Sequence, residues 1–360
     1  MKNFLLLFVL IPAVCVAKPK PIDRHALPQV EALYDQLASL KGKGMLFGHH
    51  CALTSGKEFE EWPAIENEPR CDVKTAVGDY PAIFSFDFGR GFSQNLPYVI
   101  KAGEMGGIVT ISYHISNPMG EKTFYVIDKK RREVAGILPG GRNHAFLTAQ
   151  LDSIADFAHK AVANGEKIPI IFRPWHEHTG AWFWWGISSC SEDEFNELWR
   201  FTVTYLRDKK DVHNFLYAFS PSHPQKNGYG YRNPGPDYYD IAGFDCYKEE
   251  DYAPDFIANA KVTVEYANKH DKIAACTEFG YKKGIQNSKN PKWHTEQFLE
   301  PLKNDPLACQ MVFAVTWANK GQHRWVPLQG DLQYDDFVTF YHDPFMIFLE
   351  KWKNEQTKKQ

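Results

Sequence analysis

Eight short apolar runs recur along the chain, and their spacing limits the folds open to it. The runs are nearly continuous in apolar or small residues and do not alternate with polar ones. That pattern is typical of parallel strands that are covered on both faces. The sequence therefore predicts a parallel sheet whose strands cover residues 45–48, 82–87, 108–113, 168–172, 215–219, 240–245, 273–277 and 311–316.

Segments with helical periodicity separate the predicted strands. Ser191 and Glu194 have the spacing of a capping box, which begins one of these helices. Strands that alternate with helices, without a linker or a break in composition, favour one closed barrel. We therefore expect an α/β fold, a single (β/α)8 TIM barrel, over residues 18–360. Two apolar helix faces are predicted, one with Leu147, Leu151, Ile154, Phe157 and Val162, the other with Phe195, Leu198, Thr202 and Tyr205.

The N-terminus has the order of a secretory signal. Lys2 precedes an apolar run over residues 4–14, and the small residue Ala17 follows. The run is too short to span a membrane stably. We expect residues 1–17 to be a signal peptide and the protein to be periplasmic or extracellular. Cys15 leaves lipoprotein anchoring open, although Val14 before it is a poor match to the small residue that such processing prefers.

Composition excludes several classes of protein. The chain has 360 residues, of which 44% are hydrophobic, and a formal net charge of -3, so it is neither disordered nor a basic nucleic-acid binder. Beyond Cys15, six cysteines remain, without paired CxxC spacing, so a thiolate zinc site is not expected. A disulfide between Cys51 and Cys71 is left open. We expect a monomer that needs no metal or cofactor.

Polar residues gather where the predicted strands end, and two of them are carboxylic acids. Glu177 follows the fourth strand and Glu278 follows the seventh. In a closed barrel the carboxyl ends of the strands form the active site, so these side chains can converge across its mouth. Retaining glycosidases use two carboxyl groups about 5–5.5 Å apart, one as acid and base and one as nucleophile. The sequence therefore predicts a glycosidase pair.

The sequence neighbours of the two acids suggest their roles. Glu177 lies beside His176 and a tryptophan cluster, where burial against apolar rings raises a carboxyl pKa, as a general acid requires. Glu278 needs to stay ionised as a nucleophile. A hydrogen bond from Tyr247, at the adjacent strand end, can keep it so.

One segment, FRPWHEHTGAWFWWG at residues 172–186, resembles the acid/base signature of glycoside hydrolase family 26, a clan A family dominated by β-mannanases. Other stretches that resemble the family are FGHH, SYHISNP, AFSPS, DIAGFDCY, TEFG and VTWAN. The resemblance implies that Glu177 is the proton donor and Glu278 the nucleophile. It also implies a sugar site lined by His114, His176, Trp182, Asp245, Tyr247 and Trp317.

The resemblance further implies a retaining β-mannanase. It would hydrolyse β-1,4-mannosidic bonds of mannan, glucomannan, galactomannan or manno-oligosaccharides by double displacement. His176 is the expected contact for the axial 2-hydroxyl of mannose. Trp182 and Trp317 are expected to stack on sugar faces, while Trp184 or Trp185 packs against the barrel. Residues 117–144 and 229–239 are the expected groove walls, and cleavage inside the chain or at its ends is left open.

Other functions remain open at this point. Within the family, a β-1,3-1,4-glucanase and a β-1,3-xylanase share the catalytic framework. A carbohydrate-binding protein that lost catalysis has the same aromatic content, although the presence of both Glu177 and Glu278 argues against it. A metal-dependent barrel hydrolase is the remaining alternative, suggested by His49, His50, His114, His176 and His178.

Overall fold

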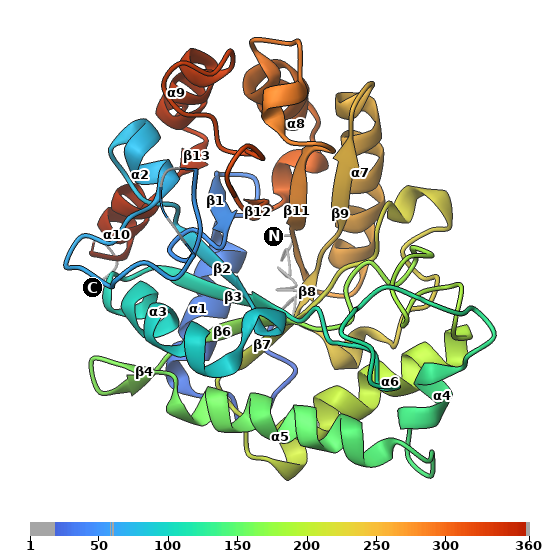
Figure 1. The fold of residues 1–360 in the computed structure, drawn as a ribbon. Helices are drawn as coiled ribbons and strands as arrows, with labels where there is room; N and C mark the ends of the chain where they lie inside the picture. The colour runs from blue at the N-terminus through green and yellow to red at the C-terminus, as the bar shows by residue number, and fades with distance from the viewer. Residues whose placement is uncertain (1–18, 58, 60, 358–360) are drawn as a thin grey trace, which may run out of the picture.

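The computed structural model describes residues 19–357, except residues 58 and 60. The predicted signal peptide therefore lies outside the described residues. Parallel strands form the centre and helices surround them (Figure 1). The strands are β1 Met45–His50, β2 Ile83–Asp87, β3 Ile108–Ser112, β4 Val162–Ala163, β5 Glu166–Lys167, β6 Ile170–Arg173, β7 Phe215–Phe219, β8 Ile241–Ala242, β9 Asp245–Lys248, β10 Ile273–Ala274, β11 Cys276–Tyr281, β12 Phe313–Thr316 and β13 Met346–Ile347.

The main sheet closes into a barrel, and two of the barrel strands are each interrupted by one or two residues. The hydrogen-bonded order runs β10-β8-β7-β6-β3-β2-β1-β12-β11-β9. Only residues 243–244 separate β8 from β9, and only Ala275 separates β10 from β11. Backbone pairing continues across both gaps, because Ala275 donates to Ala242 O (3.0 Å) and Thr277 donates to Phe244 O (2.9 Å). The two interrupted strands lie side by side, so eight parallel strands form a ring of the TIM-barrel type.

The helices form the outer layer of the barrel. No α-helix follows β7 within the described residues 220–240, where short 3-10 turns take its place. α1 closes the opposite, amino-terminal end: Gln29 bonds to Lys167 O and Tyr34 bonds to Asp271 O, both just before strands. The helices are α1 Pro28–Ser39, α2 Asp72–Val77, α3 Phe92–Glu104, α4 Glu133–Ile137, α5 His144–Lys160, α6 Glu192–Thr204, α7 Tyr252–Lys269, α8 Glu300–Asn304, α9 Tyr334–His342 and α10 Leu349–Thr357.

The predicted apolar runs coincide with all eight barrel strands. Every residue of β1, β2, β3 and β7 is buried, as covered parallel strands require. The capping box of Ser191 and Glu194 is confirmed at the start of α6. One helix face was extended too far. α5 ends at Lys160, and Val162 belongs to the small antiparallel pair of β4 and β5.

The structure tests the disulfide that the sequence left open between Cys51 and Cys71. Cys51 and Cys71 are both free and buried, so the disulfide considered for them is wrong. Their side chains are part of the packed interior, where a thiol behaves as a small apolar group. Over the described part of the chain, every helix is too short or too polar to cross a bilayer.

Candidate active site

An open cavity of about 610 Å³ lies at the carboxyl ends of the barrel strands and contains both predicted acids. A second cavity of about 510 Å³ adjoins it, and the two share His114, Phe124, Trp317 and Trp325 in their walls. Together they form one groove, which we call the active-site groove. Its first part is lined by Glu177, Glu278, Tyr247, Trp182 and residues of the segment after β7, among others.

Glu278, on β11, is held by a guanidinium and a hydroxyl donor. The Arg173 guanidinium contacts one carboxylate oxygen, and the Tyr247 hydroxyl donates to the other at 2.9 Å. Burial and the neighbouring Glu278 raise the pKa of Tyr247 well above its usual value, so the phenol keeps its proton and remains a donor. An ionised, oriented carboxylate is the form that can attack an anomeric carbon.

Arg173 connects Glu278 to a second buried acid below the groove floor. One guanidinium nitrogen donates to Asp245 at 2.8 Å, and the Thr277 hydroxyl donates to the other Asp245 oxygen at 2.6 Å. Burial opposes the charge of Arg173, but Asp245 and Glu278 outweigh it and raise the Arg173 pKa. Asp245 has no exposed surface and is absent from the groove wall. Its visible contacts hold Arg173 in place.

Glu177 follows β6 on a strained stretch of backbone. Its φ is 52°, and that of Trp175 is 51°, a left-handed conformation that costs a non-glycine residue on the order of 1–3 kcal/mol. Hydrogen bonds hold the strained stretch, since Glu177 N donates to Ser220 O (2.8 Å) and Trp185 Nε1 donates to His176 O (2.8 Å). The strain aims the Glu177 carboxyl into the groove.

The surroundings of Glu177 favour its protonated form. Burial raises the Glu177 pKa well above its usual value, and the negative charges of Asp245 and Glu278 add to the effect. Among the described residues, the side chain that donates to it is Trp182, whose indole N–H lies at 2.9 Å. Glu177 therefore has the environment of a general acid, whereas Glu278 has that of a nucleophile.

Two of the predicted sugar contacts are histidines, and they lie at different depths. His114 lines the groove, and its Nδ1 is 2.6 Å from Asp87. Burial lowers the His114 pKa, but Asp87 more than compensates, so the net direction is upward. His176 is 1% exposed and its Nε2 is 3.1 Å from Nε2 of His114. His176 thus stands behind His114 and is absent from the groove wall.

The tryptophans divide as the sequence predicted. Trp182 is 39% exposed and lines the groove. Trp317 also lines it, stacked on His50 with ring centroids 4.2 Å apart. Trp184 and Trp185 are both fully buried, so two of the four indoles pack against the barrel.

The groove walls match one predicted loop and not the other. Phe124 and Tyr125, from the segment 117–144, line the groove. Residues 229–239 do not. Tyr229 of that segment is buried, and its hydroxyl lies within hydrogen-bond distance of Phe219 O and Gly243 O. The second wall comes instead from residues just after β7, which the sequence analysis missed.

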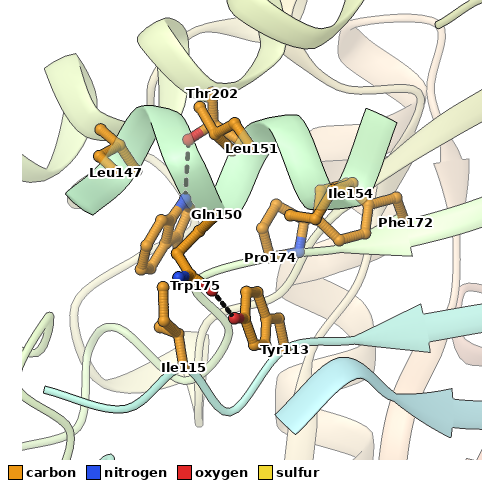
Figure 2. Close-up of a pocket in the computed structure, with 10 residues that line it drawn as sticks. All are labelled: Tyr113, Ile115, Leu147, Gln150, Leu151, Ile154, Phe172, Pro174, Trp175 and Thr202. Carbon is orange, nitrogen blue, oxygen red and sulfur yellow. Dashed lines mark hydrogen bonds between the residues drawn. The ribbon is translucent and has the colours of Figure 1, made fainter. Parts of the chain in front are cut away.

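A different cavity lies behind the site and has no room for a sugar. Figure 2 shows it between the strand ends and α5, where Trp175 Nε1 donates to Thr202 at 3.0 Å and Tyr113 bonds to Gln150. Its volume is about 10 Å³, the space of one water at most. Trp175 is one of its lining residues and is buried, so this indole is not part of the groove.

The histidines that suggested a metal-dependent hydrolase do not share one ligand position among the described residues. His50 bonds to Ser85 at 2.7 Å, and His178 stacks on Phe195. The group within reach of a common ion in that part of the chain is a different one, His223, Cys246 and Asp255.

Several residues of the site were not assigned by sequence reasoning. Arg173 and Asp87 end strands, so the polar strand-end pattern that selected the two glutamates could have selected them as well. Other missed wall residues lie in loops or short turns, where no periodicity marks them: Arg90, His223 and Trp325.

A (β/α)8 barrel with two carboxyl groups of opposite character in an aromatic-lined groove defines a glycoside hydrolase. A profile of glycosyl hydrolase family 26 matches residues 22–294, and the chain belongs to this family. The resemblance of the segment 172–186 to the family is thereby confirmed.

Relatives and solved structures of the family are similar over most of the chain. A mannan endo-1,4-β-mannosidase of Bifidobacterium adolescentis is 33% identical over 83% of this chain, which spans about a third (32%) of that relative's length. A modular endo-β-1,4-mannanase from Cellulomonas fimi is 34% identical, with a TM-score of 0.84, covering 92% of this chain and 78% of that one. The catalytic domain of a Bacillus sp. JAMB-750 endo-β-1,4-mannanase is 33% identical, with a TM-score of 0.86, covering 93% and 95%.

Proposed function

We propose that the protein is a retaining β-mannanase that hydrolyses β-1,4-mannosidic bonds in mannan, glucomannan or galactomannan. The observation that carries the proposal is the contrast between the two groove carboxyls: cation and hydroxyl donors surround Glu278, while burial and like charges surround Glu177. Membership of family 26 and the mannanase names of the relatives support the substrate.

In the first step, Glu278 attacks the anomeric carbon while Glu177 gives its proton to the glycosidic oxygen. The carbon–oxygen bond to the leaving sugar breaks, and a covalent ester between Glu278 and the retained sugar forms. Arg173 and Tyr247 hold the attacking carboxylate ionised until its charge is neutralised in that ester. The raised pKa of Glu177 keeps its proton available at neutral pH.

In the second step, Glu177, now ionised, removes a proton from water, and the resulting hydroxide attacks the anomeric carbon. The ester bond breaks, Glu278 leaves as a carboxylate, and the product keeps the β configuration. The indole N–H of Trp182 donates to Glu177, and this bond is stronger once Glu177 is ionised, because charge-assisted hydrogen bonds exceed neutral ones.

The other side chains supply sugar contacts and support. Trp182 and Trp317 offer ring faces to the C–H faces of mannose. His114 is the histidine on the groove wall, and we assign it the contact to the 2-hydroxyl that was expected of His176. His176 and Asp245 lie beneath the wall, where they position His114 and Arg173.

The shape of the groove favours cleavage of chains with sugars on both sides of the scissile bond. The two adjoining cavities, about 610 and 510 Å³, meet at His114 and Trp317. Sugars bound in the two cavities would therefore approach the acids from two different directions.

We further propose that the protein is exported as a monomer with residues 1–17 as its signal peptide, and that it meets the polysaccharide outside the cytoplasm.

Chromatography of products over time from linear mannan, mixed-linkage glucan and β-1,3-xylan tests the proposal. Wild type should cleave mannan, while Glu177→Ala and Glu278→Ala should lose most of the rate, since acid/base groups alone contribute about 10²–10⁴-fold. Glu31→Ala, on α1 at the opposite end of the barrel, is the control and should be fully active. Cleavage of glucan or xylan alone would contradict the substrate, and an active glutamate variant would contradict the roles.

A further inference from the structure

The wall of the groove next to Glu177 is polar and comes from the segment after β7. Four residues of this segment line the groove, and none is a Trp, Tyr or Phe: Ser222, His223, Lys226 and Asn227. The proposed mechanism uses none of them. We call this segment, residues 222–227, the polar wall.

The polar wall is tied to the segment that carries the general acid. The Thr179 hydroxyl donates to Ser222 O at 2.7 Å, and Ser222 N donates to that hydroxyl at 3.0 Å. Glu177 gives its proton to the leaving oxygen, so the leaving sugar must lie on this side. The adjoining cavity, lined by His50 and Arg90, belongs to the other side.

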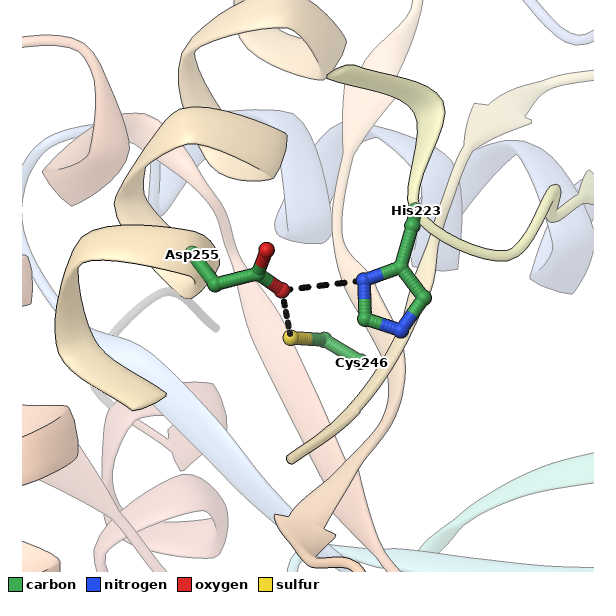
Figure 3. Close-up of side chains that lie close together, drawn as sticks. All are labelled: His223, Cys246 and Asp255. Atoms are coloured by element: carbon green, nitrogen blue, oxygen red, sulfur yellow. Dashed lines mark hydrogen bonds and ion pairs between the residues drawn. The ribbon is translucent and has the colours of Figure 1, made fainter. Parts of the chain in front are cut away.

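His223 is held through one ring nitrogen, and its other ring nitrogen has no hydrogen-bond partner in the part of the chain that the structure describes. Its Nδ1 lies 2.9 Å from a carboxylate oxygen of Asp255, near the start of α7. Figure 3 shows the imidazole with this nitrogen toward Asp255 and the other turned away from it. With Nδ1–H donating to Asp255, Nε2 carries a lone pair. The side chain is 19% exposed and lines the groove.

The charge state of His223 suits a hydrogen-bond acceptor. Burial lowers the His223 pKa, and the positive charge of Lys226 acts in the same direction, while Asp255 opposes both without reversing them. A neutral imidazole with Nδ1 protonated can accept only at Nε2. A sugar hydroxyl is the donor that a groove for polysaccharide would bring there.

Asp255 is satisfied by protein groups, which makes it a support for His223 and not a metal ligand. Gln225 Nε2 donates to its second oxygen at 3.1 Å, and the Lys248 ammonium lies 3.8 Å from the same atom. The third member of the group in Figure 3 is Cys246. Its thiol donates to the Asp255 oxygen that also bonds to His223, at 3.6 Å, so Cys246 is another protein partner of this carboxylate.

We propose that His223 is a sugar-binding residue on the leaving-group side, whose Nε2 accepts a hydrogen bond from a hydroxyl of the leaving sugar. Asp255 is its positioning residue, because it fixes the tautomer and the orientation of the ring. This inference rests on the proposed function. It adds a specificity contact that the reaction itself does not need.

Two substrates that differ only in the leaving group isolate this contact. One is a manno-oligosaccharide cleaved to release a sugar, and the other carries an aryl group at the same position. His223→Ala should lower the ratio of kcat/KM for the sugar over the aryl leaving group about tenfold, the usual size of one hydrogen bond. His223→Gln, whose amide oxygen can accept, should recover part of the ratio, and Asp255→Ala should lower it less than His223→Ala does.

His213 provides a matched control at the other end of the same strand. Its Nδ1 also lies 2.8 Å from an aspartate, Asp23, and its side chain is 23% exposed. His213→Ala should leave the ratio unchanged. The inference is overturned if His223→Ala keeps the wild-type ratio, or if a chelator changes the ratio and Zn²⁺ restores it. If wild type cleaves neither substrate, the proposed function fails first.

Discussion

Glu177 and Glu278 face the same groove, yet different groups contact their carboxyls. Glu278 sits on β11 between a guanidinium and a phenol. Glu177 sits on strained backbone and receives one indole hydrogen bond. The nearby acids Asp245 and Glu278 raise its pKa. The roles proposed for the two acids therefore follow from their surroundings, because the residue type is the same.

Removing each carboxyl in turn should have the largest effect on activity. Glu278→Ala should lose on the order of 10⁴-fold in kcat on any substrate, because no other group can form the ester. Glu177→Ala should keep fast formation of the ester from a dinitrophenyl glycoside, whose leaving group needs no proton, and then stall. Azide, which needs no general base, should restore turnover to Glu177→Ala as a β-glycosyl azide. Recovery of a β-azide from Glu278→Ala instead would reverse the roles.

The next largest effect should come from Arg173, the cation of the Glu278 region. Arg173→Lys keeps the charge but cannot contact Asp245 and Glu278 with two separate nitrogens, so kcat should fall about 10²-fold. Steady-state kinetics on mannan measure this, and thermal unfolding checks that the variant folds. A folded variant with wild-type kcat would show that Glu278 does not depend on this pair.

Tyr247 should contribute less, since it supplies one hydrogen bond. Tyr247→Phe should lower kcat/KM by about 10–100-fold, the size of a bond to a charged group. Tyr217→Phe is the matched control: that hydroxyl is buried and has no partner among the described residues, so its removal should leave kcat/KM unchanged.

The smallest effect should appear at the basic limb of the pH profile. Glu177 must be protonated to act, so activity is lost as the pH rises through its raised pKa. The Trp182 indole favours the ionised form, and Trp182→Phe should therefore raise the Glu177 pKa further and move the basic limb to higher pH. A shift to lower pH in kcat/KM profiles would contradict this assignment.

Much of the scaffold could be predicted because burial leaves a local signature. Covered parallel strands are apolar runs, and the pair Ser191 and Glu194 marks a helix start within four residues. The interruptions at residues 243–244 and Ala275 could not be predicted, because the residues there are also apolar or small. Backbone hydrogen bonds between the neighbouring strands continue across them.

The site was predictable where function sits directly at a strand end, and not where it depends on depth or on loop geometry. Glu177 and Glu278 stood out for that reason. His176 and Asp245 also lie near strand ends, but the sequence could not tell that both are buried beneath the groove wall. His223 lies four residues beyond β7, and only the distance to Asp255, 32 positions later, reveals its orientation.

Labelling with a 2-deoxy-2-fluoro-β-manno-oligosaccharide that carries a dinitrophenyl leaving group tests directly whether Glu278 is the nucleophile. The fluorine slows breakdown of the covalent intermediate, so the attached sugar can be located by mass spectrometry of peptides. The contrast between the two regions predicts one label, on the peptide carrying Glu278, in wild type and in Glu177→Ala. A label on Glu177, or rapid turnover without any labelled peptide, would contradict it.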